Sequence, residues 1–294
     1  MQTNITLAAG WQDYTLLDCG GGEKFERWGN VTVVRPDPQA IWPRNADVDW
    51  NAADMRYHRS KSGGGQWEVV HPVPEAWTIE YDKMRFHIRP TGFKHMGLFP
   101  EQAVNWRWMQ SLIRAAQKNA SRKEPIRVLN LFAYTGGATV ACLQAGASVT
   151  HIDAAKGMNQ WARDNAALSG FGAAPLRVLT DDVLKFVQRE GRRGNRYDAI
   201  IMDPPVFGRG PGGEMWKLED KLYTLVCACA AILSDAPLFV LVNAYTAGFA
   251  PAVYGNVLAA TFGNRCAITA GEIGLAATSG PILPCGMYAR AHFA

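Results

Sequence analysis

Residues 126–137 read IRVLNLFAYTGG, in which an apolar run leads into an aromatic turn with two glycines. The apolar run is typical of a buried strand. Gly136 and Gly137 allow the backbone to approach a ligand closely and to open a helix immediately afterwards. The stretch therefore predicts a strand that ends abruptly, a tight turn and a helix, with a ligand bound at the junction.

The chain around this stretch alternates between strand-like and helix-like segments. Strands are expected at residues 127–132, 148–153, 174–180, 198–203 and 237–243, with helices between them. This alternation predicts a parallel sheet that helices cover on both faces. Two further strand-like segments near the end of the chain complete the expected α/β fold, whose sheet has seven strands and is mostly parallel.

The first ninety residues have a different character, because they contain six of the ten tryptophans. Residues 77–81 and 85–90 are strand candidates, and Asp82-Lys83 between them predicts a hairpin. We therefore expect two domains. Residues 1–92 form a small β-rich, Trp-rich domain, and residues 93–294 form the domain that carries the large sheet.

The overall composition narrows the class of protein. The net charge of +4 is compatible with a nucleic-acid partner but is too small to establish one. The six cysteines lack metal-ligand spacing, which favours reduced thiols and no metal site. The uncharged stretch from residue 236 to residue 264 contains prolines and glycines that would interrupt a membrane helix. We expect a cytoplasmic protein without a membrane segment.

Polar side chains follow several of the expected strands. Asp153 ends the second strand, Asp182 follows the third and Asp203 follows the fourth. Ligands of open α/β sheets collect at the carboxyl edge, where these residues lie. Asp153 is placed to accept hydrogen bonds from both ribose hydroxyls of a nucleoside, and Asp182 from an adenine amino group, with the Val183 amide donating to the ring. A structural alternative stays open, since Asp153 and Asp182 can instead cap the helices that follow them.

The aromatic turn favours one nucleoside cofactor over another. An NAD site requires the spacing G-x-G-x-x-G, which residues 130–137 lack. Phe132 and Tyr134 would crowd a diphosphate, but they suit S-adenosylmethionine, which has no phosphate. An aromatic ring near its sulfonium would contribute about 0.5–2 kcal/mol.

Four segments carry a family resemblance, namely VLNLFAYTGG (128–137), HIDAAKGMNQWARDN (151–165), TDDVLKF (180–186) and DAIIMDPPVFGRG (198–210). Together they resemble the class I S-adenosylmethionine-dependent methyltransferases, and most closely the branch that contains the 23S ribosomal RNA cytosine-C5 methyltransferases. The resemblance implies a Rossmann-like fold. It also implies cofactor contacts at Asn130, Phe132, Ala133, Tyr134, Thr135, Gly136, Asp153, Ala154, Asp182, Val183 and Asp203. FKHMGLFPEQ (93–102) resembles the segment before the sheet in this family, and implies that Phe99 and Gln102 cover the methionine end of the cofactor.

The chain departs from this branch at one position. Methylation of pyrimidine C5 requires a cysteine thiolate that first adds to C6, and the cysteine of the family lies just after the fifth strand. Residues 239–248 read FVLVNAYTAG and place Asn243, Ala244 and Tyr245 there instead. We therefore expect direct in-line methyl transfer to a nitrogen or oxygen, with Asp203 and Tyr245 as the catalytic residues.

Substrate contacts are expected after the fourth strand. Asp203 and the Pro204 carbonyl are placed to hold an acceptor amine, as a D-P-P-[YF] motif does in amino-methylating relatives. The glycine-rich segment that follows suits a mobile loop over the substrate, with Phe207 and Trp216 stacking on it and Arg209 contacting a phosphate; a simple connector is the alternative. RNA, and ribosomal RNA in particular, is the expected substrate, and a protein side chain or a small molecule is the alternative.

Overall fold

The computed structural model describes residues 4–60, 64–118, 124–245 and 248–293. The chain divides into two compact units, and each is described by itself. The sheet unit consists mainly of Asn105–Glu272 and Gly286–Ala294. The N-terminal unit consists of Ile5–Val104 and Ile273–Cys285.

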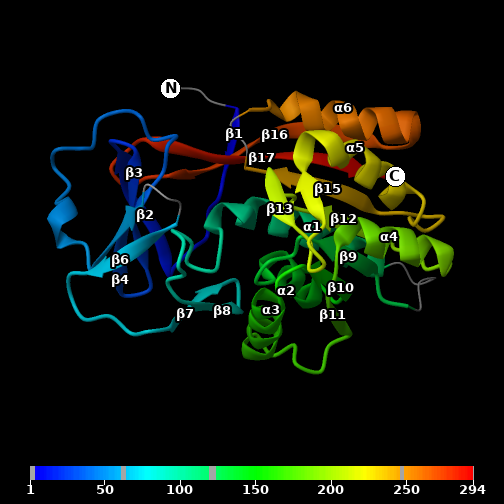
Figure 1. Cartoon of the computed structure of the whole chain (residues 1–294), viewed down its shortest axis with the longest axis horizontal. Helices are drawn as coiled ribbons and strands as arrows, with labels where there is room; N and C mark the ends of the chain where they lie inside the picture. The colour runs from blue at the N-terminus through cyan, green and yellow to red at the C-terminus, as the bar shows by residue number, and fades with distance from the viewer. Residues whose placement is uncertain (1–3, 61–63, 119–123, 246–247, 294) are drawn as a thin grey trace. The chain divides into compact units, whose positions relative to one another are not determined.

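The large sheet has eight strands in the order β1-β16-β17-β15-β12-β9-β10-β11 (Figure 1). Parallel ladders join β11, β10, β9, β12 and β15, whereas β17 runs antiparallel to β15. The predicted, mostly parallel α/β sheet is therefore confirmed. It has one strand more than predicted, because the three-residue strand β1 adds to its edge. The strand bounds are β1 (Ile5–Leu7), β9 (Arg127–Leu131), β10 (Ser148–Asp153), β11 (Leu176–Thr180), β12 (Ala199–Met202), β15 (Phe239–Ala244), β16 (Ala267–Ala276) and β17 (Ile282–His292).

The central strands explain why the sheet is parallel. All residues of β12 and β15 are buried, and so are all residues of β9 except the first. Strands that are buried on both faces have continuous apolar runs, whereas half-exposed strands alternate between apolar and polar residues. Helices therefore have to cover both faces of this sheet.

Successive side chains of β15 pack against different helices. Val240 and Val242 belong to the core that α4, α5 and α6 form with the sheet, whereas Phe239 packs on Trp108 of α1, with 5.0 Å between the ring centroids. Figure 1 shows α5 and α6 on one side of the strands and α2 and α3 on the other. No helix within the described ranges is long and apolar enough to cross a bilayer. The helix bounds are α1 (Ala103–Gln117), α2 (Gly137–Gln144), α3 (Lys156–Leu168), α4 (Val183–Arg192), α5 (Leu218–Ala230), α6 (Pro251–Phe262), and the 3-10 turn η3 (Gly263–Arg265).

The N-terminal unit contains a five-stranded sheet in the order β2-β3-β4-β5-β6 and the separate pair β7-β8. Asp82 and Lys83 join β7 to β8 with φ angles of 45° and 66°. Two successive left-handed residues are typical of a type I′ hairpin turn, so the predicted hairpin is confirmed. The bounds are β2 (Tyr14–Gly20), β3 (Glu23–Trp28), β4 (Val31–Pro36), β5 (Met55–Arg59), β6 (Gly65–Val69), β7 (Trp77–Tyr81), β8 (Met84–Ile88), and the 3-10 turns η1 (Trp50–Ala52) and η2 (Pro100–Gln102).

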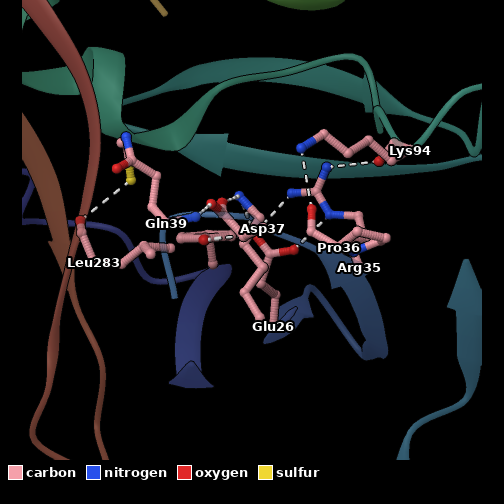
Figure 2. Close-up of polar contacts among 10 residues, drawn as sticks. Glu26, Arg35, Pro36, Asp37, Gln39, Lys94 and Leu283 are labelled. Atoms are coloured by element: carbon pink, nitrogen blue, oxygen red, sulfur yellow. Dashed lines mark hydrogen bonds and ion pairs between the residues drawn. The ribbon is translucent and has the colours of Figure 1, made fainter. Parts of the chain in front are cut away.

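A buried ion pair joins β3 to β4 in this unit. Arg35 donates from Nε to Oε2 of Glu26 at 2.6 Å and from Nη2 to Oε1 at 2.8 Å (Figure 2). The Tyr14 hydroxyl donates to Oε1 at 2.8 Å, and Lys24 Nζ lies 3.7 Å from the same oxygen. Burial opposes the ionisation of Glu26, but Arg35 and Lys24 outweigh it and lower the pKa of Glu26 from 4.5 to about 2.

The same cluster also forms hydrogen bonds with Lys94, which lies beyond residue 92. Arg35 Nη1 donates to the carbonyl of Lys94 at 2.9 Å, and Lys94 Nζ donates to the carbonyl of Pro36 at 3.0 Å (Figure 2). The boundary predicted between residues 92 and 93 therefore falls inside the N-terminal unit, which continues to Val104.

Replacing one partner of this ion pair is expected to destabilise the protein strongly. Glu26→Gln leaves the buried Arg35 charge uncompensated, which lowers the free energy of unfolding by roughly 3–5 kcal/mol. Because the pKa of Glu26 is depressed in the folded state, its contribution is present above pH 4.5 and is lost as the pH falls toward about 2. Urea unfolding at pH 7 and pH 3 should show the difference between wild type and variant shrinking at the lower pH.

Glu68→Gln provides the matched control. Glu68 also sits on a strand of the N-terminal unit, but its ion pair with His58 is more than half exposed. An exposed pair contributes less than about 1 kcal/mol. Equal losses in the two variants would contradict the importance of the Glu26 pair.

Candidate functional site

Four neighbouring strands end at one carboxyl edge of the sheet. Their last aligned residues lie opposite one another in parallel register, namely Ile152 (β10), Leu131 (β9), Met202 (β12) and Val242 (β15). The next residues along the four strands are Asp153, Phe132, Asp203 and Asn243. The structure thus brings together the aromatic turn and two of the three carboxylates that the sequence predicts for this edge.

The turn between β9 and α2 has a strained backbone. Phe132 and Tyr134 have φ angles of 53° and 51°, which cost about 1–2 kcal/mol per residue with a side chain. Gly136 follows with a φ angle of 85°, and a Cβ built on it would lie 2.9 Å from the Cβ of Ala162 in α3. Only glycine meets both the backbone and the packing requirement at this position.

Hydrogen bonds from neighbouring segments hold the turn. The Ala133 amide donates to the carbonyl of Ile152 at 3.1 Å. The Asn165 side chain, in α3, donates from Nδ2 to the carbonyl of Thr135 at 2.9 Å. Ala133 and Thr135 are 7% and 1% exposed. Each of these residues therefore has little accessible surface for the cofactor contact that the sequence predicts.

Asp153 links the turn to β10. Its Oδ2 accepts from the Tyr134 amide at 2.8 Å, and its Oδ1 accepts from the Ala155 amide at 2.9 Å. Burial raises the pKa of Asp153, and the two amides partly offset this effect. A carboxylate has about four acceptor sites, so two remain for the ribose hydroxyls that the sequence predicts. Ala154, which follows Asp153, is half-buried, and its predicted contact with the cofactor stays a prediction.

Asp182 caps a helix, which is the structural alternative considered for it. Its Oδ1 accepts from the Lys185 amide at 2.9 Å and so satisfies the first turn of α4. The second oxygen faces Gly210, where an added Cβ would lie 3.0 Å away. Capping leaves this oxygen available, and the contacts of Asp182 and the Val183 amide with an adenine ring stay predictions.

The segment after Asp203 forms a β-hairpin, where the sequence predicts a loop. Strands β13 (Phe207–Arg209) and β14 (Met215–Lys217) pair antiparallel. Trp216 is only 6% exposed, because its indole N–H donates to the carbonyl of Pro205 at 2.7 Å and its ring packs on Phe132. Trp216 therefore supports the turn and offers no free face for stacking on a substrate. Phe207 and Arg209 remain exposed.

The remaining predicted residues differ in their surroundings. The Asp203 amide donates to the carbonyl of Leu131 at 3.3 Å, and Pro204 after it is buried. Tyr245, directly after β15, is 37% exposed. Phe99 and Gln102 belong to the N-terminal unit, and their predicted cofactor contacts stay predictions.

Two buried polar networks escaped the sequence analysis. Asn130 donates from Nδ2 to Thr139 Oγ1 at 2.9 Å, and Thr139 Oγ1 lies 2.9 Å from His151 Nδ1. Burial lowers the pKa of His151 to about 3, so this ring is neutral. The Asn130 side chain is already used in the hydrogen bond to Thr139. Asn105 donates from Nδ2 to Asn243 Oδ1 at 2.8 Å. No spacing pattern relates such distant residues, so the sequence carried no signal for them.

Cys229 and Cys266, the cysteines nearest to β15 in the sequence, belong to other elements. Cys229 is buried in α5, and burial raises its pKa, which disfavours a thiolate. Cys266 lies between η3 and β16, and burial raises its pKa as well. Within the described part of the chain, no three His, Cys, Asp or Glu side chains come together in a way that would hold a metal ion.

Comparisons with known proteins agree with this geometry. Residues 47–227 match a family model described as S-adenosylmethionine-dependent methyltransferase. A solved SAM-dependent methyltransferase from Agrobacterium tumefaciens is 35% identical with a TM-score of 0.91, and the similarity covers 98% of this chain and 93% of that chain. A SAM-dependent methyltransferase structure from Streptococcus mutans is 17% identical with a TM-score of 0.71, over 96% of this chain and 76% of that chain, which shows a shared fold.

Curated relatives are similar to part of the chain. The ribosomal RNA large subunit methyltransferase K/L of Shewanella frigidimarina is 35% identical over 183 residues, which are 62% of this chain and 23% of the relative. The protein of the same name from Shewanella baltica is 30% identical over 167 residues, which are 56% of this chain and 22% of the relative. The chain thus spans less than a quarter of the length of these relatives.

A methyl group added at Gly136 is expected to damage the turn. Gly136→Ala combines an unfavourable φ angle with a close contact to Ala162, which should lower the free energy of unfolding by roughly 2–4 kcal/mol. Gly157→Ala is the control, because nothing lies within 4 Å of its added Cβ and helix propensity favours alanine by up to about 1 kcal/mol. Thermal unfolding of both variants measures the contrast, and a harmless Gly136→Ala would show that the turn is not constrained.

Removing the Asp153 carboxylate is expected to abolish tight binding of S-adenosylmethionine. Each charge-assisted hydrogen bond contributes about 1.5–3 kcal/mol, so losing two should raise the Kd at least roughly a hundredfold. Isothermal titration calorimetry of Asp153→Ala measures this change. Asp164→Ala removes the same charge from the exposed face of α3 and should leave the Kd unchanged; an equal loss in both variants would argue against a ribose contact at Asp153.

Proposed function

The chain belongs to the S-adenosylmethionine-dependent methyltransferase family, and from this premise we propose that it methylates RNA, with ribosomal RNA as the substrate class. The observation that carries the proposal is the alignment of four strand ends at one edge of the sheet. Asp153 and the aromatic turn lie at the ends of β10 and β9, which we assign as the cofactor side, and Asp203 and Asn243 lie at the ends of β12 and β15, which we assign as the acceptor side. The names of the curated relatives support ribosomal RNA as the substrate.

The residues on the cofactor side fit S-adenosylmethionine. When it is bound, this cofactor supplies an electrophilic methyl group on a sulfonium. The Asp153 carboxylate keeps acceptor sites for the ribose hydroxyls, and the turn at Phe132 and Tyr134 carries aromatic rings where a phosphate-binding loop would expose only backbone. We therefore assign the binding and orientation of the donor to Asp153 and the aromatic turn.

The acceptor side supports direct transfer. Positioning an acceptor in line with the methyl group can contribute about 7–11 kcal/mol, so a nitrogen or oxygen acceptor needs no covalent intermediate. Asp203 and the Pro204 carbonyl are the groups proposed to hold the methyl acceptor. Tyr245 is the group proposed to orient or deprotonate this acceptor. Asn243, Ala244 and Tyr245 stand where the resembled C5 branch is expected to have its cysteine, which favours direct transfer over a thiolate adduct.

Exposed groups of the hairpin are the proposed RNA contacts. Phe207 is 56% exposed and suits stacking on an unpaired base, and Arg209 is exposed two residues later, where it suits a phosphate. Both lie on β13, which Val206 separates from Asp203-Pro204-Pro205. An extruded nucleotide at the carboxyl edge would thus meet a ring and a positive charge on the same strand.

Transfer of a labelled methyl group tests the proposal. Wild-type protein is incubated with methyl-tritiated S-adenosylmethionine and separate RNA, protein and metabolite fractions of a bacterial extract, and label is expected in ribosomal RNA. Asp153→Ala serves as the inactive control. Label in the protein or metabolite fraction alone would contradict an RNA substrate, while leaving the methyltransferase assignment intact.

Cysteine substitution tests direct transfer in the same assay. Cys229→Ser and Cys266→Ser are expected to transfer label to RNA at wild-type rates, because neither thiol lies at the end of β15. Loss of transfer in either variant, with unchanged binding of S-adenosylmethionine, would show that a thiol participates.

A further inference from the structure

A directional hydrogen-bond relay ends at the acceptor side of the site. Arg290 of β17 donates to Asn105 Oδ1 from Nε at 3.2 Å and from Nη2 at 2.6 Å. Asn105 of α1, which is 0% exposed, donates from Nδ2 to Asn243 Oδ1 at 2.8 Å. Three residues from distant parts of the chain, all within the sheet unit, thus form one continuous line.

The polarity of this relay is set by the guanidinium group. Arginine has only donors, so the oxygen of Asn105 must face Arg290 and its NH₂ must face away from it. The NH₂ of Asn105 in turn requires the oxygen of Asn243. Each amide is therefore held in one of its two orientations, which local packing alone would not distinguish.

Arg290 is held firmly enough to impose this polarity. Its guanidinium carbon lies 4.7 Å from the ring centroid of Trp108 and 4.1 Å from that of Tyr288. Burial lowers the pKa of Arg290 to about 10, so the group stays charged at neutral pH. Two aromatic faces and two hydrogen bonds to one oxygen therefore fix the position of Arg290, the cation at the start of the relay.

The relay leaves the NH₂ group of Asn243 as its free end. The side-chain nitrogen and oxygen atoms of the described residues that are sealed from solvent without a partner are Trp28 Nε1, His151 Nε2, Asn159 Oδ1 and Tyr254 OH. Nδ2 of Asn243 is not among them. Within the described residues, the side chain of Asn243 makes one hydrogen bond, which its Oδ1 accepts from Asn105. The residue, which is 4% exposed, thus keeps a donor within reach of a ligand.

This donor lies beside the proposed acceptor-holding residues. Met202 and Val242 are partners in the parallel ladder, so Asp203 and Asn243 follow them on strands about 5 Å apart. Tyr245 is two residues further along, and its ring contacts Gly286, where an added Cβ would lie 3.0 Å from Cε1. A group held at Asp203 for methylation therefore has the Asn243 amide at its flank.

We propose that Asn243 determines acceptor specificity by donating a hydrogen bond from Nδ2 to a carbonyl oxygen or ring nitrogen of the substrate base, next to the atom that is methylated. The inference rests on the proposed function, because it names which edge of a nucleobase the site selects. Bases that present a donor at this place are rejected, since two NH groups would then face each other. Asn105 and Arg290 are positioning residues, because they orient the amide without contacting the substrate.

Two substitutions at Asn243 separate a donor role from a structural one. Asn243→Asp keeps the shape and still accepts from Asn105, but at pH 8 it has no donor. Asn243→Ser is smaller, yet its hydroxyl can accept from Asn105 or donate to a base. We expect kcat/KM for the labelled acceptor to fall roughly tenfold to a hundredfold in Asn243→Asp and less in Asn243→Ser, because an unpaired buried acceptor costs about that much. Calorimetry with S-adenosylmethionine verifies that both variants are folded and bind the cofactor.

The pH profile adds a readout that packing would not change. As the pH falls, the introduced carboxyl of Asn243→Asp gains a proton and becomes a donor again, so its activity relative to wild type should rise. A pH-independent ratio, together with Asn243→Ser less active than Asn243→Asp, would overturn the inference. Arg290→Lys, which retains a donor-only cation, should keep more activity than Arg290→Gln, whose amide can face Asn105 either way; the reverse order would also count against the relay.

The outcomes distinguish this inference from the proposed function. If wild-type protein labels proteins or metabolites and not RNA, the RNA proposal and the nucleobase contact of Asn243 both fail, while the methyltransferase assignment stands. If wild type labels RNA and the Asn243 variants match it, only the inference fails. The absence of label in every fraction would contradict both.

Discussion

The strained turn after β9 is the constraint on which the rest of the sheet unit depends. Phe132 and Tyr134 adopt left-handed backbone conformations that cost a few kcal/mol together, and such residues persist only where the surroundings over-determine them. Here the surroundings are the Asp153 carboxylate on one side and the carbonyl of Ile152 on the other. The turn therefore exists only when β10 is paired with β9, so that the fold and the cofactor side of the site form together.

The Asp153 carboxylate consequently has a structural role and is also available for the proposed ribose contact. Asp153 accepts from the amide of Tyr134, which stabilises the turn, and it retains further acceptor sites. Asp182 is similar, because it caps α4 with only one of its two oxygens. Structural and functional interpretations of such residues are thus compatible, because a carboxylate has more acceptor sites than one cap requires.

The sequence predicted those parts of the site that depend on local conformation. The strand ends at Asp153 and Asp203 and the glycine at position 136 follow from spacing, because strand, turn and helix are set within a few residues. The stacking role predicted for Trp216 does not fit the structure, since the segment pairs as a hairpin and alternation along β14 turns this ring inward onto Phe132. The boundary predicted after residue 92 lies inside the N-terminal unit for a similar reason. Arg35 donates a hydrogen bond to the carbonyl of Lys94, which is 59 positions away in the chain.

The sequence by itself determined the order of strands and helices, the position of the tight turn and which polar residues follow the strands at the carboxyl edge. These properties are local, since backbone preference and apolar spacing act between near neighbours. Only the tertiary structure decided which polar groups meet across the chain, such as Arg290 with Asn105 and Asn105 with Asn243. The physical reason is that a buried amide acquires its orientation from whatever donor or acceptor the fold places beside it, and no spacing in the sequence records that neighbour.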